Sequence, residues 1–183
     1  MMGHLLAFSR GVDAVNAAVG RVADWFVLLA CVVSAGNAFV RYGVSYSSNA
    51  WLEVQWYFFA GIIMLGASYT LFRNEHVRVD LVYGNLGERA RIWVDVFGIV
   101  LFLLPATALL TWMTWPFFVD SFVRDEGSPN AGGLLRWPVK ILMPLGFLLL
   151  TLQGLSELVK RIALLRGERA AAEAVAEYHR PDQ

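Results

Sequence analysis

Three acidic residues of this chain stand in long apolar stretches, where a carboxylate often marks an ion or proton pathway. They are Asp24, Asp95 and Glu157. Each has a basic residue three or four positions away, a spacing that places both side chains on the same face of a helix. We therefore expect structural ion pairs rather than ion carriers. The expected basic partners are Arg21, Arg91, and Lys160 or Arg161.

Glu53 differs because no basic residue precedes it on its own helix. It lies two residues into the second apolar stretch, close to Gln55. Three roles fit this position: a structural pair with Arg41 or Lys140, contact with a partner protein, and proton transfer. Glu53 is too shallow for a gated site at the midplane of a membrane, so we favour the structural pair.

The other residue types that carry chemistry are sparse. The histidines, His4, His76 and His179, all lie outside the apolar stretches, so no pair is placed to ligate haem between membrane helices. They form no cluster with the single cysteine, Cys31, that would bind a metal ion, and one cysteine excludes an internal disulfide. We expect no cofactor, no bound metal and no enzymatic activity.

The elements that position these residues are four long apolar segments. Hydrophobic residues make up 57% of the chain and the mean hydropathy is +0.53, which is too apolar for a soluble domain of this size. Each segment can cross a hydrocarbon core of about 30 Å, which takes about 20 helical residues. We predict an all-α membrane protein with four transmembrane helices and short amphipathic helices at the membrane surface. The spans are 22–40, 51–72, 92–115 and 138–162.

These spans form one membrane domain, residues 22–163. Residues 1–21 are expected to be a cytoplasmic amphipathic segment, and residues 164–183 a cytoplasmic tail. The first segment is too long and too polar for the start of a signal peptide, so we expect the first span to stay as an uncleaved anchor. A formal net charge of zero gives no general attraction to nucleic acid.

The distribution of basic residues predicts the orientation. Eleven lie before the first span, between the second and third, or at and after the end of the fourth, and four lie on the other side. Because cytoplasmic loops carry the excess of lysine and arginine, both termini are expected to be cytoplasmic. The seven tryptophans fall near the predicted span ends, as in an interfacial aromatic belt. The four basic residues expected outside are Arg41, Arg124, Arg136 and Lys140.

The connecting segments and two prolines carry further patterns. Residues 9–20 have apolar side chains at helical spacing, and two alternatives stay open: a short helix on the cytoplasmic surface, or a frayed N-terminus that continues into the first span. Residues 76–91 are expected to form an extended entry into a short interfacial helix. Residues 120–136 hold several charges and are rich in turn-forming residues. Pro105 and Pro144 should kink the third and fourth spans.

Small and polar residues inside the spans indicate helix contacts. Ala30, Ser34 and Ala38 repeat every four residues, and small side chains at that spacing let helices approach closely. Asn37 and Gln153 are the polar residues deepest in the spans. We expect them to form hydrogen bonds between helices.

Two stretches resemble the small membrane subunit of TRAP transporters, the tripartite ATP-independent periplasmic carriers of bacteria. They read SSNAWLEVQWYFFAGIIMLGASYTLFRNEHVRVDLVYG and SPNAGGLLRWPVKILMPLGFLLLTLQGLSELVKRI. The resemblance covers roughly residues 41–162. The residues that carry it are Glu53 at the start of the second span, the segment from His76 to Asp80, and Pro144 and Gln153 in the fourth span.

The resemblance implies a scaffold in the bacterial inner membrane that holds a separate large subunit. That subunit carries the substrate and the sodium ions, and a periplasmic binding protein delivers the substrate. Uptake of an organic acid, such as a 2-oxoacid or a sulfonate, is then driven by sodium without ATP. We expect contacts with both proteins and with lipids, and none with nucleic acid. The residues expected to make structural or partner contacts are Arg41, Glu53, Gln55, His76, Arg78, Asp80, Arg124, Asp125, Glu126, Lys140 and Gln153.

Two other functions are weighed against this one. An autonomous four-helix exporter coupled to protons needs a carboxylate embedded in its first span, and here that span has only Asp24 near its start. A structural or redox subunit of another membrane complex would need haem-ligating or quinone-site histidines in its spans. Neither pattern is present in the sequence.

Overall fold

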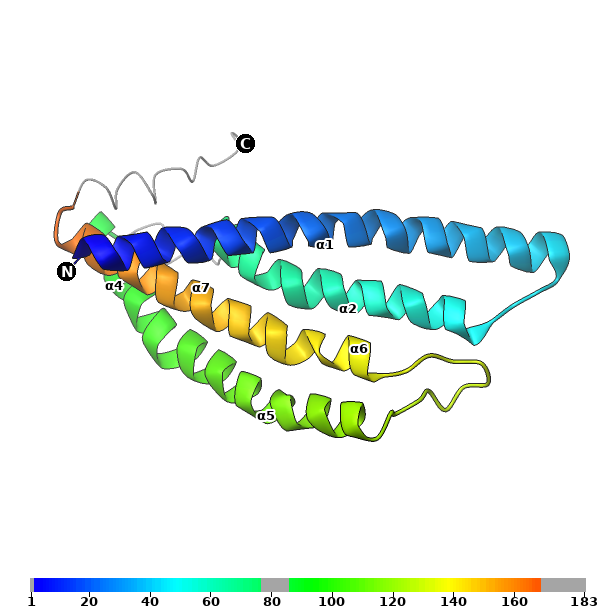
Figure 1. Cartoon of the computed structure of the whole chain (residues 1–183). Coiled ribbons are helices and arrows are strands. Elements are labelled where there is room, and N and C mark those ends of the chain that lie inside the picture. The colour runs from blue at the N-terminus through cyan, green and yellow to red at the C-terminus, as the bar shows by residue number, and fades with distance from the viewer. Residues whose placement is uncertain (1, 77–85, 169–183) are drawn as a thin grey trace.

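The computed structural model describes residues 2–76 and 86–168. Within this part of the chain, four helical spans run up and down along a common direction (Figure 1). The start of α1 and the end of α7 lie at one end of the bundle, named here the terminal end. The loops 45–48 and 124–136 lie at the opposite end, the loop end. The elements are α1 (Met2–Val44), α2 (Asn49–Phe72), α4 (Glu88–Gly98), η1 (Ile99–Leu103), α5 (Leu104–Val123), α6 (Trp137–Lys140) and α7 (Leu142–Leu165).

The predicted fold class is confirmed in its main feature. Four helical stretches are long and apolar enough to cross a membrane, and they contain the four predicted spans. The third helical stretch continues past residue 115 to Val123. The turn-rich segment predicted at 120–136 therefore begins as a loop only at Arg124. The interfacial helix predicted within 76–91 falls mostly on residues 77–85, outside the described residues.

α1 is one unbroken helix of 43 residues, which passes through residue 21 without interruption. At 1.5 Å per residue its length is about 65 Å, which exceeds the roughly 40–45 Å of a bilayer with its headgroups. Residues 2–21 continue the helix because one of their faces is buried in the bundle. Leu6, Ser9, Asn16 and Gly20 are buried on that face. Residues 9–20 therefore continue into the first span, but as ordered helix rather than as the frayed N-terminus of the second alternative.

Proline distorts two spans where the sequence predicts it. The backbone nitrogen of Pro105 cannot donate a hydrogen bond, and the preceding residues, Ile99–Leu103, form a π-helical segment between α4 and α5. In the fourth span, Pro144 cannot donate to the carbonyl of Lys140, and the helix is interrupted at Ile141 between α6 and α7.

Small residues bring the helices into close contact. A Cβ atom on Gly146 would lie 2.5 Å from the backbone oxygen of Met64, so only glycine lets α7 pack this tightly on α2. Gly61 packs in the same way against the ring of Phe26 on α1. Large apolar side chains point outward instead, as expected for a surface that meets lipid: Trp112 is 74% exposed.

Candidate functional site

The loop end of the bundle is built around one face of α2. Asn49, Glu53 and Tyr57 are spaced four residues apart, so they point to the same side of the helix. All three bind the segment 124–136. The Asn49 amide donates to the carbonyl oxygen of Ala131 at 2.9 Å, and the Tyr57 hydroxyl donates to the carbonyl of Leu135.

Glu53 is the centre of this contact and is only 4% exposed. Its carboxylate accepts hydrogen bonds from the Ser128 hydroxyl, from Asn130 Nδ2 at 2.8 Å and from the backbone N–H of Leu134 at 2.6 Å. Gly133 makes room for this arrangement, because a Cβ atom there would lie 2.8 Å from Glu53 Oε1. Glu53 therefore holds the loop 124–136 against α2.

The predicted pairing of Glu53 with Arg41 or Lys140 is wrong. Lys140 instead forms a salt bridge with Glu126, and its ammonium lies 3.9 Å from the ring centroid of Phe117. Three neutral donors from the loop satisfy Glu53, so the carboxylate does not need a cation in contact.

The Glu126–Lys140 salt bridge fixes the base of the loop. The hydrogen bond from Lys140 holds the pKa of Glu126 below its usual value, with smaller contributions from Ser121 and Arg136. The backbone N–H of Arg136 also donates to the carbonyl oxygen of Glu126 at 2.8 Å. A carboxylate with a lowered pKa stabilises the folded loop above the ordinary pKa of glutamate, and this stabilisation is lost as the pH falls through the lowered value.

Two charged residues of the loop point into solvent. Arg124 lies 2.7 Å from Asp120, one helical turn earlier, and both side chains are exposed. Asp125 is exposed and adopts a left-handed backbone conformation with φ of 46°. Glu126 therefore stabilises the loop through its salt bridge with Lys140, whereas the side chains of Arg124 and Asp125 are exposed to solvent.

The other predicted contact residues lie away from this loop. Arg41 is exposed near the C-terminal end of α1, and His76 is exposed just beyond α2. Gln55 lies in a groove between α1 and α2. Arg78 and Asp80 are outside the described residues.

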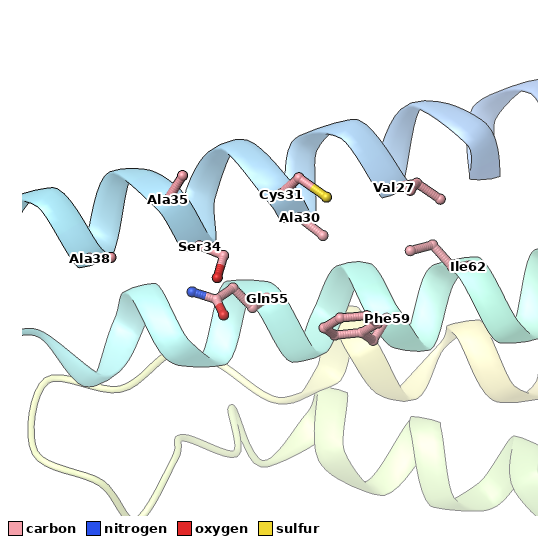
Figure 2. Close-up of a pocket in the computed structure, with 9 residues that line it drawn as sticks. All are labelled: Val27, Ala30, Cys31, Ser34, Ala35, Ala38, Gln55, Phe59 and Ile62. Carbon is pink, nitrogen blue, oxygen red and sulfur yellow. The ribbon is translucent and has the colours of Figure 1, made fainter.

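The groove between α1 and α2, called here the α1–α2 groove, has a volume of about 460 Å³ (Figure 2). α1 lines it mostly with small side chains, including Ala30, Ser34 and Ala38. Of these, Ala30 is buried, whereas Ser34 and Ala38 are exposed. Of the small-residue stripe predicted to bring helices together, only Ala30 is therefore covered by other residues. The part nearer the loop end, Ser34 and Ala38, is exposed.

A second polar cluster lies toward the terminal end, between α1 and α7. Gln153 is fully buried; its Oε1 accepts from Asn16 Nδ2 at 2.6 Å, and its Nε2 donates to Asp13 Oδ1 at 2.9 Å. The hydroxyl oxygens of Ser9 and Ser156 are 2.6 Å apart. The predicted hydrogen bonding of Gln153 between helices is confirmed.

Charged residues extend this cluster to α4. Lys160 is 2% exposed and lies 2.6 Å from Glu157 and 3.0 Å from Asp13. Arg161 binds Asp95 at 3.0 Å and lies 3.5 Å from Glu157. The predicted pairing of Glu157 is thus confirmed with both basic neighbours, and Asp95 has a partner on another helix. We name the whole set the terminal-end network: Ser9, Asp13, Asn16, Asp95, Gln153, Ser156, Glu157, Lys160 and Arg161.

Sequence reasoning missed the part of this network on α1. Ser9, Asp13 and Asn16 are spaced as one helix face, which matches the polar stripe of α7. That spacing was a usable signal for two polar faces in contact.

The network joins three helices through paired charges. Asp13, Asp95 and Glu157 each contact a lysine or arginine within 3.5 Å. In residues 2–76 and 86–168, no group of three acidic, histidine or cysteine side chains is arranged to hold a metal ion. Paired and hydrogen-bonded charges of this kind fix the packing of α1, α4 and α7.

A comparison with protein families gives one result. The model described as "Tripartite ATP-independent periplasmic transporters, DctQ component" matches residues 30–164. The matched region begins within α1 and reaches the end of α7, and it includes Glu53, the loop 124–136 and the α7 side of the terminal-end network. No curated protein and no solved structure matches the chain.

Proposed function

Because the chain belongs to the DctQ-component family of the tripartite ATP-independent periplasmic transporters, we propose that it is the scaffold for a separate large subunit. That subunit would carry the substrate, an organic acid, together with sodium ions. A periplasmic binding protein would deliver the substrate, and both subunits would reside in the bacterial inner membrane. The family match over residues 30–164 of a four-span protein is the observation that carries this proposal.

The disposition of charge supports a fixed scaffold. An ion carrier needs an ionisable group that can exchange its ion within the membrane. Here the acidic residues of the terminal-end network are paired with lysine or arginine, and the Glu53 carboxylate accepts hydrogen bonds from the loop. With the termini in the cytoplasm, as the basic residues predict, the loop end would face the periplasm. The loop 124–136 would then face the binding protein.

Reconstitution tests the proposal directly. Liposomes containing this chain alone, with the binding protein outside, should show no uptake of a labelled organic acid when a sodium gradient is applied. Liposomes containing this chain and the large subunit should show uptake above that of empty liposomes. Sodium-driven uptake by the chain alone would contradict the scaffold function.

Reversing the exposed charge of Asp125 should weaken docking of the binding protein. Exposed charges at the rim of an interface mainly change the association rate, and salt screens them. We expect Asp125→Lys to raise the binding-protein concentration for half-maximal uptake several-fold at low ionic strength, with a smaller effect at high salt. The matched control is Glu75→Lys, because Glu75 is an exposed carboxylate at the opposite end of α2. Identical curves for Asp125→Lys and wild type would exclude this residue from docking.

A further inference from the structure

The α1–α2 groove is a surface that residues 2–76 and 86–168 leave unfilled. Its lining residues lie on the parts of α1 and α2 nearer the loop end, where the two helices separate in Figure 1. α1 continues past the start of α2 at this end, and its Phe39 and Tyr42 are 80% and 85% exposed. Tyr42 follows Ala38 by one helical turn, so the small-residue face of α1 continues directly into an exposed aromatic side chain.

The groove contains polar groups that lipid tails cannot satisfy. Figure 2 shows the Ser34 hydroxyl and the Gln55 amide facing each other across it. Neither side chain has a hydrogen-bond partner among the residues that the structure describes. An amide or hydroxyl facing hydrocarbon without a partner is unfavourable. The occupant should therefore present hydrogen-bonding groups as well as apolar surface.

The shape of the groove indicates what kind of occupant this is. Small side chains on one wall let the backbone of another helix approach closely, and polar residues then form hydrogen bonds between the helices. On the other wall, Phe59 and Ile62 provide apolar surface. A transmembrane helix with small residues and at least one polar side chain matches all of these features.

We propose that the α1–α2 groove receives one transmembrane helix of the large subunit, with Gln55 as its polar contact. This inference rests on the proposed scaffold function and adds the place and the chemistry of the contact. It assigns a role to the small-residue stripe: Ala30 packs within the chain, whereas Ser34 and Ala38 receive the partner.

Cys31 provides the first test, because it lines the groove, is exposed and is the single cysteine of the chain. Its alkylation by a membrane-permeant maleimide should be at least tenfold slower in the complex than in the isolated subunit, with both in the same lipid nanodiscs. The matched control is the double variant Cys31→Ser, Val32→Cys. Val32 is 59% exposed and does not line the groove, so the rate at that position should not change.

Filling the groove provides the second test. Ala35 lines the groove and is exposed, so Ala35→Trp can occupy the space without disturbing buried residues. We expect it to lower co-purification of the large subunit at least fivefold, while Val32→Trp leaves the yield unchanged. Gln55→Leu should also lower the yield, because it removes the polar contact. A lipid-facing position would instead tolerate or favour leucine.

The outcomes separate this inference from the scaffold function. If the wild-type subunits co-purify but Cys31 stays equally reactive and Ala35→Trp retains the complex, the groove is not the contact and the scaffold function stands. If wild-type subunits do not associate at all, the scaffold function itself fails.

Equal protection of Cys31 without the large subunit would assign the groove to lipid. An oxidative Cys31–Cys31 dimer formed in the complex would assign it to a second copy of this chain. Either result would overturn the proposal.

Discussion

Replacing Lys160 with methionine should destabilise the protein by about 3–5 kcal/mol, the range found when one partner of a buried ion pair is removed. Lys160 is 2% exposed and neutralises both Asp13 and Glu157. Methionine fills a similar volume but leaves Asp13 without a basic partner and Glu157 with Arg161 alone. The change should appear as a lower midpoint of thermal unfolding in detergent, followed by circular dichroism.

Two further variants distinguish charge from packing. Arg166→Met removes a basic residue that is exposed just after α7, so its midpoint should equal that of wild type. Adding Asp13→Asn to Lys160→Met should recover part of the loss, because it removes the carboxylate that has no other basic partner in the network. A Lys160→Met protein as stable as wild type would show that the terminal-end network does not hold the helices together.

Replacing Glu53 with alanine should release the loop 124–136 while the four spans stay folded. The substitution removes the acceptor of three hydrogen bonds, and a hydrogen bond to a charged group contributes about 1.5–3 kcal/mol. We expect a roughly 100-fold faster exchange of the Leu134 amide hydrogen, because this N–H donates to the Glu53 carboxylate and loses its acceptor.

Hydrogen exchange measured by mass spectrometry over residues 126–136 tests this expectation. The matched control is Glu75→Ala, an exposed glutamate at the other end of α2, which should leave exchange in the loop unchanged. The released loop should also dock the binding protein poorly, so uptake by the reconstituted transporter should fall. Unchanged protection of the Leu134 amide would mean that other contacts, such as Asn49 to Ala131, are sufficient to hold the loop.

The sequence by itself determined the features that depend on neighbours within one or two helical turns. Long apolar runs predicted the four spans, because a helix is the arrangement that satisfies the backbone of a single segment in lipid. Proline predicted the distortions in the third and fourth spans, since its missing N–H acts on the preceding turn. The spacing of Glu157 from Lys160 and Arg161 predicted their pairing for the same reason.

Only the tertiary structure decided which distant residues meet. Glu53 accepts hydrogen bonds from residues at least 75 positions away, and Asp13 binds Gln153 across 140 positions. The register between helices selects such partners, and close contacts such as Gly146 on Met64 set that register. The tertiary structure also decided that α1 runs unbroken from Met2. The polar face of residues 9–16 is stabilised by hydrogen bonds to α7 rather than to water. Helical spacing fixes which side chains share a face, but the packing of whole helices fixes what that face contacts.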